Sequence, residues 1–331
     1  MSHLLRRGLA SIAIVICGLT DQAIATAAND PSIAVAYALP GDRAYPESIA
    51  VDPRNGDTYV SSYTTGAVFR AASGAATAET FLAPGADGRN TANGVKVDPA
   101  GRLWVIDSTA GVSVYDTVTH ARLARFTVAA TNPFFVNDLA FTADGTAYLT
   151  DSKRPVVYRV TPGQFAEATA NGGCGELIPA MDLGAVVPPH GPDAFTLNGI
   201  AVDPTGRYLL TVDMTGGGLF RASLNPGDPN PVRKVTLNGG DMKAADGIEL
   251  RGETLWVAHN STNSISRWRL SDDGATATQE QRFTDQSLRV PTGLVHVGDR
   301  LLVTASQFDK GGPMGQGTPT LPFAVLDVSG I

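Results

Sequence analysis

The sequence predicts an all-β protein built from repeated four-stranded units. Short apolar runs of four to six residues recur along the 331 residues, bounded by Gly, Pro, Asp and Asn, whereas long runs with the helical period are absent. One segment returns six times, and an extra apolar run precedes the first copy. Charged residues make up only 17% of the chain, so there is material for a substantial core.

The repeated segment sets the number of units. The copies read ESIAVDPRNGDTYVSS from Glu47, NGVKVDPAGRLWVIDS from Asn93, NDLAFTADGTAYLTDS from Asn137, NGIAVDPTGRYLLTVD from Asn198, DGIELRGETLWVAHN from Asp246 and TGLVHVGDRLLVTAS from Thr292. Their starts are 46, 44, 61, 48 and 46 residues apart. Six copies with a period in the forties predict a six-bladed β-propeller with one blade per copy. The long interval is explained by an inserted loop at about residues 163–192.

Each copy predicts a hairpin followed by two further strands. In the fourth copy, GIAV and RYLLTV flank the turn Asp-Pro-Thr-Gly. Third strands follow as AVFRAA, GVSVYD, VVYRVT, GLFRAS, ISRWRL and FAVLDV, and weaker fourth runs include ARFTVAA and VRKVTLN. The last copy ends without a fourth run. We therefore expect the strand at residues 32–40, SIAVAYALP, to complete the last blade and close the ring, which removes an open sheet edge.

The N-terminus has the pattern of a secretory signal. Arg6 and Arg7 precede an apolar run that is too short to span a bilayer, and small residues at alternate positions follow, with cleavage expected near Ala25 or Ala27. We expect residues 1–27 to be removed and residues 28–331 to form a single domain. The expected location is secreted or periplasmic, with no stable membrane insertion after cleavage.

Charge and cysteine content narrow the partners. The net charge is −7, and the loss of residues 1–27 removes a net +1, which leaves about −8. That argues against nucleic acid and anionic membrane surfaces as partners. Only Cys174 then remains, so no internal disulfide is expected, and its neighbours NGGCGE favour an inert thiol.

The first residue of each copy is predicted to lie at one mouth of the central channel, because the innermost strand of each blade runs along it. These residues are Glu47, Asn93, Asn137, Asn198, Asp246 and Thr292. All carry oxygen donors, and carboxylate and amide oxygens suit Ca²⁺. The alternative is that Asn, Asp and Thr only cap turns ahead of strands. Glu47 favours the metal site, because beside Asp246 it would need a cation or a proton.

At these residues the chain resembles the gluconolactonase/regucalcin family of six-bladed propellers. The shared motifs are Glu47, Asn137-Asp138, Leu197-Asn198-Gly199-Ile200 and Asp246-Gly247-Ile248, in the family's order. The resemblance implies one divalent cation, Ca²⁺ first and Zn²⁺ or Mn²⁺ as alternatives. It implies Glu47, Asn198 and Asp246 as the metal ligands, with Asn137 near the substrate.

One departure from the family bears on the substrate. Sugar-lactone members often carry an Arg two residues before the blade-three Asn, and this chain has Phe135 there, beside Phe134. An Arg would bind hydroxyl or carboxylate groups, which Phe cannot do. We therefore expect Phe134 and Phe135 to form an apolar wall and the substrate to be a more apolar ester or lactone.

The sequence is compatible with two functions. The first is a divalent-metal-dependent hydrolase of a lactone or related ester, with Asp246 as the base, and with Asn137 and Asn93 bonding substrate oxygens. His190 would reach the substrate from the inserted loop, unless it is simply a solvated loop histidine. The alternative is a noncatalytic secreted propeller that binds a small ligand or a protein. Glu47 and Asp246 at one channel mouth favour the hydrolase.

Overall fold

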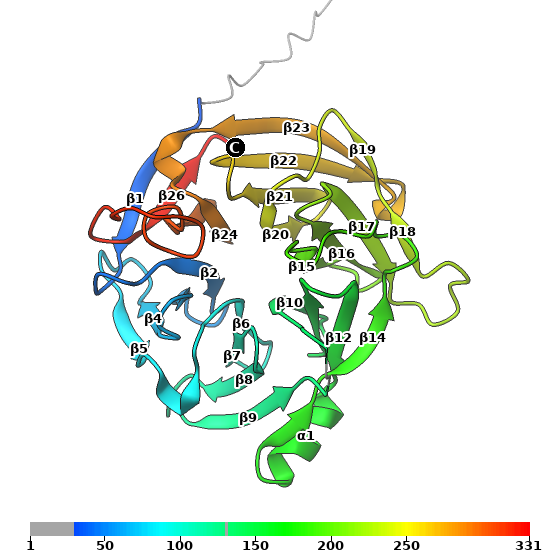
Figure 1. The fold of residues 1–331 in the computed structure, drawn as a ribbon, viewed down its shortest axis with the longest axis horizontal. Coiled ribbons are helices and arrows are strands. Elements are labelled where there is room, and N and C mark those ends of the chain that lie inside the picture. Colours follow the sequence, from blue (N-terminus) through cyan, green and yellow to red (C-terminus); the bar gives the residue numbers. More distant parts are fainter. Residues whose placement is uncertain (1–29, 130–131) are drawn as a thin grey trace, which may run out of the picture. The chain divides into compact units, whose positions relative to one another are not determined.

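The computed structural model describes residues 30–129 and 132–331, so the predicted signal at 1–27 lies outside the described residues. The described residues form six mainly antiparallel sheets arranged around a central axis, as Figure 1 shows. This confirms the predicted six-bladed β-propeller. Among the same residues, no helix is long and apolar enough to cross a membrane.

The blades follow the chain in order, each with its innermost strand first. Blade 1 holds β2 (Pro46–Val51), β3 (Thr58–Ser62), β4 (Val68–Ala71) and β5 (Glu79–Leu82); blade 2 holds β6 (Val95–Val97), β7 (Arg102–Asp107), β8 (Gly111–Asp116) and β9 (Arg122–Thr127); blade 3 holds β10 (Val136–Phe141), β11 (Ala147–Asp151), β12 (Val156–Val160) and β14 (Ile178–Asp182). Blade 4 holds β15 (Leu197–Val202), β16 (Tyr208–Asp213), β17 (Gly218–Ser223) and β18 (Val232–Lys234); blade 5 holds β20 (Ala245–Arg251), β21 (Thr254–His259), β22 (Ser264–Ser271) and β23 (Thr276–Thr284); blade 6 holds β24 (Pro291–Val297), β25 (Arg300–Ala305), β26 (Ala324–Ser329) and β1 (Ser32–Ala38).

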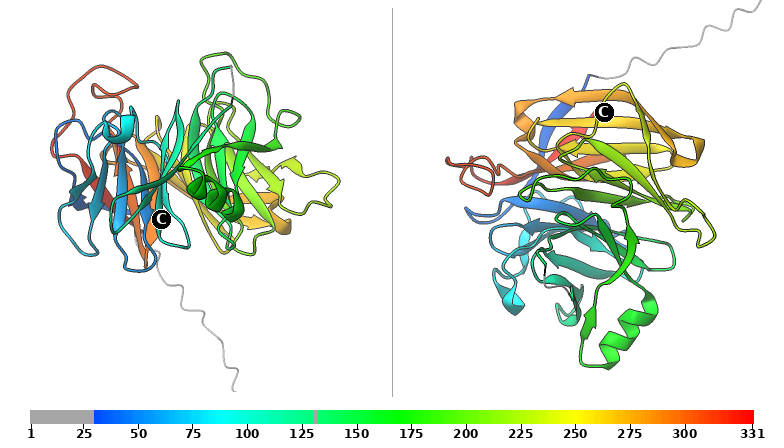
Figure 2. Two further views of the ribbon diagram at one scale, coloured as in Figure 1. Left: turned by 90° about the horizontal axis from the view of Figure 1, so that it is seen from below. Right: turned by 45° about the vertical axis from the view of Figure 1, so that its right-hand side comes forward.

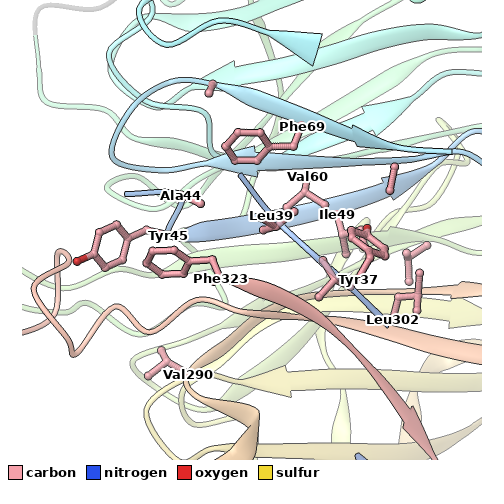
Figure 3. Packing of buried hydrophobic residues seen from close by; sticks show 14 of the residues in the cluster. Tyr37, Leu39, Ala44, Tyr45, Ile49, Val60, Phe69, Val290, Leu302 and Phe323 are labelled. Carbon is pink, nitrogen blue, oxygen red and sulfur yellow. The ribbon is translucent and has the colours of Figure 1, made fainter. Parts of the chain in front are cut away.

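The ring closes through the N-terminal strand, as predicted. β1 (Ser32–Ala38) pairs antiparallel with β26 and so becomes the outer strand of blade 6. Tyr37 is only 5% exposed, and its hydroxyl lies 2.7 Å from that of Thr58 in blade 1. Figure 3 shows Tyr37 in the apolar cluster that joins blades 1 and 6, with Ile49 and Leu302.

The insertion at 163–192 is not simply a loop, which corrects the prediction. It contains most of α1 (Pro162–Ala170), which begins at a capping box between Thr161 and Gln164. β13 (Cys174–Glu176) then adds a parallel fifth strand to blade 2, beside β9. β14 supplies the outer strand of blade 3. The extra sequence therefore extends one blade and completes another.

The innermost strands share a local irregularity at the predicted ring residues. The pairing register shifts between Leu197 and Ile200 in blade 4, and the same shift occurs in blades 1, 3, 5 and 6. Bulges of this kind redirect side chains, and here they flank the residues at the channel mouth.

The Asn198-Gly199 pair is explained by close packing between blades, not by a tight turn. A Cβ on Gly199 would lie 2.2 Å from the carbonyl oxygen of Asp246 in the next blade. The glycines after Asn93, Asp246 and Thr292 are equally confined, at 2.5, 2.6 and 2.9 Å. Neighbouring inner strands thus approach so closely that these positions have no room for a side chain.

Candidate metal and hydrolytic site

A cavity of about 490 Å³ lies at one mouth of the channel. Five of the six predicted ring residues line it, namely Glu47, Asn93, Asn137, Asn198 and Asp246, together with Asn260. Thr292 does not line the cavity, and its hydroxyl instead bonds to the backbone carbonyl of Glu47 and to Ser306. Blades 1, 4 and 5 thus bring Glu47, Asn198 and Asp246 into one space.

Glu47 is buried against other acidic groups. It is 7% exposed, and the amide nitrogen of Asn93, oriented toward it, donates to both carboxylate oxygens at 2.7 and 2.9 Å. Burial raises the pKa of Glu47 well above its usual range, and the charges of Asp246 and Asp138 raise it further. Two acids that repel each other in a buried space are stabilised by a cation.

Asp246 is held from one side. It is 5% exposed, and the amide of Asn260 donates to its Oδ2 at 2.7 Å. Burial raises the pKa of Asp246 to about 7 and the charge of Asp138 adds to this, while the hydrogen bonds from Asn260 and Asn198 oppose the rise. Burial likewise raises the pKa of Asp138, against the charge of Lys96.

The donor atoms fit a hard cation. The amide nitrogen of Asn137 donates to Ser152 Oγ at 2.8 Å, but its buried Oδ1 has no hydrogen-bond partner. A buried acceptor without a donor is costly unless a ligand supplies one. Within the described chain, no group of three or more His, Cys, Asp or Glu side chains is arranged to hold a metal. A cation at this site would therefore depend on amide oxygens as well as on the two carboxylates.

Part of the cavity wall is apolar. Phe135 lines it and makes an edge-to-face contact with Phe195, ring centroids 5.0 Å apart. Tyr63 and Phe308 also line the cavity and contact each other, with ring centroids 5.5 Å apart. The connection between β25 and β26, which contributes Phe308, Pro313 and Met314, projects beyond the strands in Figure 2.

Two predicted residues lie elsewhere. Phe134 does not line the cavity: it packs against the apolar cluster of blades 2 and 3, because adjacent residues of an extended chain point to opposite sides. His190 lies in a separate, proline-lined hollow, and its Nε2 bonds to Asp213 Oδ2 at 2.8 Å. The structure therefore does not bring His190 to the cavity, although the chain just after it delivers Phe195.

Sequence reasoning missed the partners that hold the ring residues. Ser108, Ser152 and Asn260 each follow the end of a second strand and bond to Asn93, Asn137 and Asp246. Their signal was present, since all occupy the same phase of the repeat. Asp138, although part of a motif, was not recognised as a third acid near the site.

Comparisons with known proteins agree with the fold. No protein-family model matches the sequence, and no curated protein matches it. Among solved structures, the chain is similar to a gluconolactonase from Xanthomonas campestris, at 17% identity over 94% of this chain and 93% of the other, with a TM-score of 0.61. It is also similar to a calcium-binding regucalcin from Agrobacterium tumefaciens (16%, 90% and 96%, TM-score 0.57). A virginiamycin B lyase from Staphylococcus aureus matches as well (11%, 91% and 99%, TM-score 0.57). At identities of 11–17%, these TM-scores show a shared propeller fold.

Proposed function

We propose that this protein is a divalent-metal-dependent hydrolase of a lactone or related ester. The observation that carries the proposal is the meeting of Glu47 and Asp246, from blades 1 and 5, in one buried cavity. A gluconolactonase and a calcium-binding regucalcin among the structural neighbours support it. A binding module has no need for two repelling carboxylates at this point.

Glu47, Asn198 and Asp246 would hold the cation, with Ca²⁺ the expected ion and Zn²⁺ or Mn²⁺ as alternatives. Such an ion supplies a Lewis acid for the ester carbonyl and acidifies water. Asp246 would accept the proton of the attacking water, and the hydrogen bond from Asn260 to its Oδ2 would hold the carboxylate in place. The free atom of Asn137 is an acceptor, so it would orient that water or a substrate hydroxyl.

The cavity wall restricts the substrate. Phe135 and Phe195 offer no hydrogen bonds, so polyhydroxylated lactones gain little from this side of the cavity. An ester or lactone with an apolar substituent could place that group against the aromatic wall and its carbonyl against the polar floor.

The test is hydrolysis of γ-butyrolactone and phenyl acetate with Ca²⁺, Zn²⁺ or Mn²⁺ and with chelator. We expect activity that requires a cation, and a loss of at least about 100-fold in Asp246→Ala with unchanged circular dichroism. Asp299→Ala, in the exposed turn between β24 and β25, is the matched control. Full activity in Asp246→Ala would exclude this assignment, and ligand binding without turnover under any ion would favour the noncatalytic propeller.

Location and partners complete the proposal. The pattern at residues 1–27 supports export to the periplasm or medium, where the free Ca²⁺ needed by a carboxylate and amide site is plentiful. The acidic composition supports a small molecule, not nucleic acid, as the partner.

A further inference from the structure

We infer that Lys243 selects esters or lactones whose apolar substituent carries an anionic group. This inference rests on the proposed function and names the class of substrate for that site. Lys243 is the one Lys or Arg lining the cavity within the described residues, and it is an exposed residue just ahead of β20.

The backbone of Lys243 is fixed on both sides. Its N–H donates to Asp241 Oδ1 at 3.1 Å, and its carbonyl accepts from His259 Nδ1 at 2.9 Å. His259 is fully buried in blade 5. The position of the Lys243 Cα is therefore fixed by contacts with the core of blade 5.

The stem of the side chain is packed while its ammonium remains available. A Cβ on Gly217 would lie 2.7 Å from Lys243 Cγ, so the stem rests on the turn between β16 and β17. Lys243 forms no ion pair with any described residue. By contrast, Lys310, in the connection between β25 and β26, forms an ion pair in which its Nζ lies 3.0 Å from Asp309 Oδ2. Because the aliphatic part of Lys243 is packed and its ammonium forms no ion pair, the ammonium is suited to bind the anionic group of a ligand.

The charges along the cavity fix how such a substrate would lie. Exposure to solvent grades along the lining: the carboxylates of Glu47 and Asp246 are buried, Phe135, Phe195 and Met214 are half-buried, and Lys243 is exposed. An anionic group is attracted at the exposed end by the Lys243 ammonium, while its apolar neighbour fits the aromatic wall. The carbonyl is then left facing the buried carboxylates. At about 490 Å³ the cavity has room for such a molecule.

The first experiment measures binding without chemistry. The probes are 5-phenyl-2-pyrrolidinone and its para-carboxyphenyl analogue, unreactive lactams of the corresponding γ-lactones, titrated calorimetrically into the Ca²⁺-loaded protein. We expect the carboxylate to improve the dissociation constant about fivefold at low salt, and the gain to shrink as salt is raised. Failure of both lactams to bind, or equal binding of the two, would overturn the inference.

Matched variants then assign the preference. Lys243→Met should remove the advantage of the anionic lactam and leave the neutral one unchanged, and Lys243→Arg should keep it. Lys310→Met makes the same change of net charge in the connection between β25 and β26, outside the cavity lining. It should therefore prefer the anionic lactam as strongly as wild type does. A preference that survives in Lys243→Met contradicts the inference.

The matching lactones separate this inference from the proposed function. We expect Lys243→Met to raise KM for the carboxyphenyl lactone with little change in kcat, because the ammonium contacts the substrate away from the reacting atoms. Anion-selective binding of the lactams with no hydrolysis of either lactone would contradict the hydrolase and leave the role of Lys243 standing. Hydrolysis of both lactones at equal efficiency would contradict only the role of Lys243.

Discussion

His259 is the buried residue whose protonation should limit stability in acid. Trp268 Nε1 donates to Ser266 Oγ, which lies 2.7 Å from His259 Nε2, while His259 Nδ1 lies 2.9 Å from the carbonyl of Lys243. A carbonyl can only accept, so Nδ1 carries the proton and Nε2 accepts from Ser266. This network is complete with a neutral imidazole.

Burial lowers the pKa of His259 to about 4 from its ordinary 6.5. The unfolded chain therefore takes up this proton at higher pH than the folded chain. The contribution of neutral His259 to the free energy of unfolding is intact above pH 6.5 and is lost as the pH falls toward 4. At about pH 4.5 the loss is about 2 kcal/mol. Urea unfolding at pH 7 and pH 4.5 isolates this loss only when wild type is compared with a His259 variant, because the raised pKa values of Glu47, Asp138 and Asp246 change stability in the opposite sense.

His259→Gln is the matched variant, since glutamine does not titrate. It should be less stable than wild type at pH 7, because it disturbs a buried network, but the difference between the two proteins should shrink at pH 4.5. A difference that stays constant over this range would show that His259 is not the group responsible.

Equivalent positions in the six repeats predicted which residues meet at the axis, but they predicted little about the orientation of individual side chains. Glu47, Asn198 and Asp246 converge because equivalent positions of a closed ring must. The phase does not tell which of two adjacent side chains faces the cavity, so Phe134 and Phe135 were not distinguished. Nor does it place a residue such as His190, which lies outside the repeat and is held by Asp213.

Among the elements, β1 carries the closure of the ring. Tyr37 is almost fully buried, whereas Val35 in the same strand is 66% exposed. Tyr37→Ala should cost about 3 kcal/mol or more, because it leaves a cavity between blades 1 and 6, and Val35→Ala should stay within about 0.5 kcal/mol of wild type. Chemical unfolding of both variants tests this difference. Equal effects would mean that β1 adds nothing beyond its backbone pairing.

Elements with long-range partners were the hardest to predict. The sequence predicts one outer strand at VRKVTLN, but the run divides at Val235: β18 completes blade 4, and β19 (Thr236–Asn238) pairs parallel with β23 in blade 5. The insertion divides in the same way between blades 2 and 3. Outer strands are short and half exposed, so their hydrophobic pattern is weak, and pairing across blades leaves no local signal.

At the scale of the whole molecule, a cation would join blade 1 to blades 4 and 5, which lie far from it in the chain. Glu47, Asn198 and Asp246 meet only in the closed ring, so an ion held by them binds the folded state and not the unfolded one. Ca²⁺ at about 100 times its dissociation constant should then stabilise the protein by about 2.7 kcal/mol. Thermal melting with chelator and with added Ca²⁺ should show one transition that moves upward as a unit.

Glu47→Gln distinguishes this from nonspecific salt effects. With chelator present, the variant should melt no lower than wild type, because the amide removes the repulsion between two buried acids while the shape is kept. With Ca²⁺, it should gain much less than wild type, because one of the two charged ligands is gone. A rise with Ca²⁺ equal to that of wild type would place the ion somewhere other than the channel mouth, and the hydrolase proposal would lose its cation.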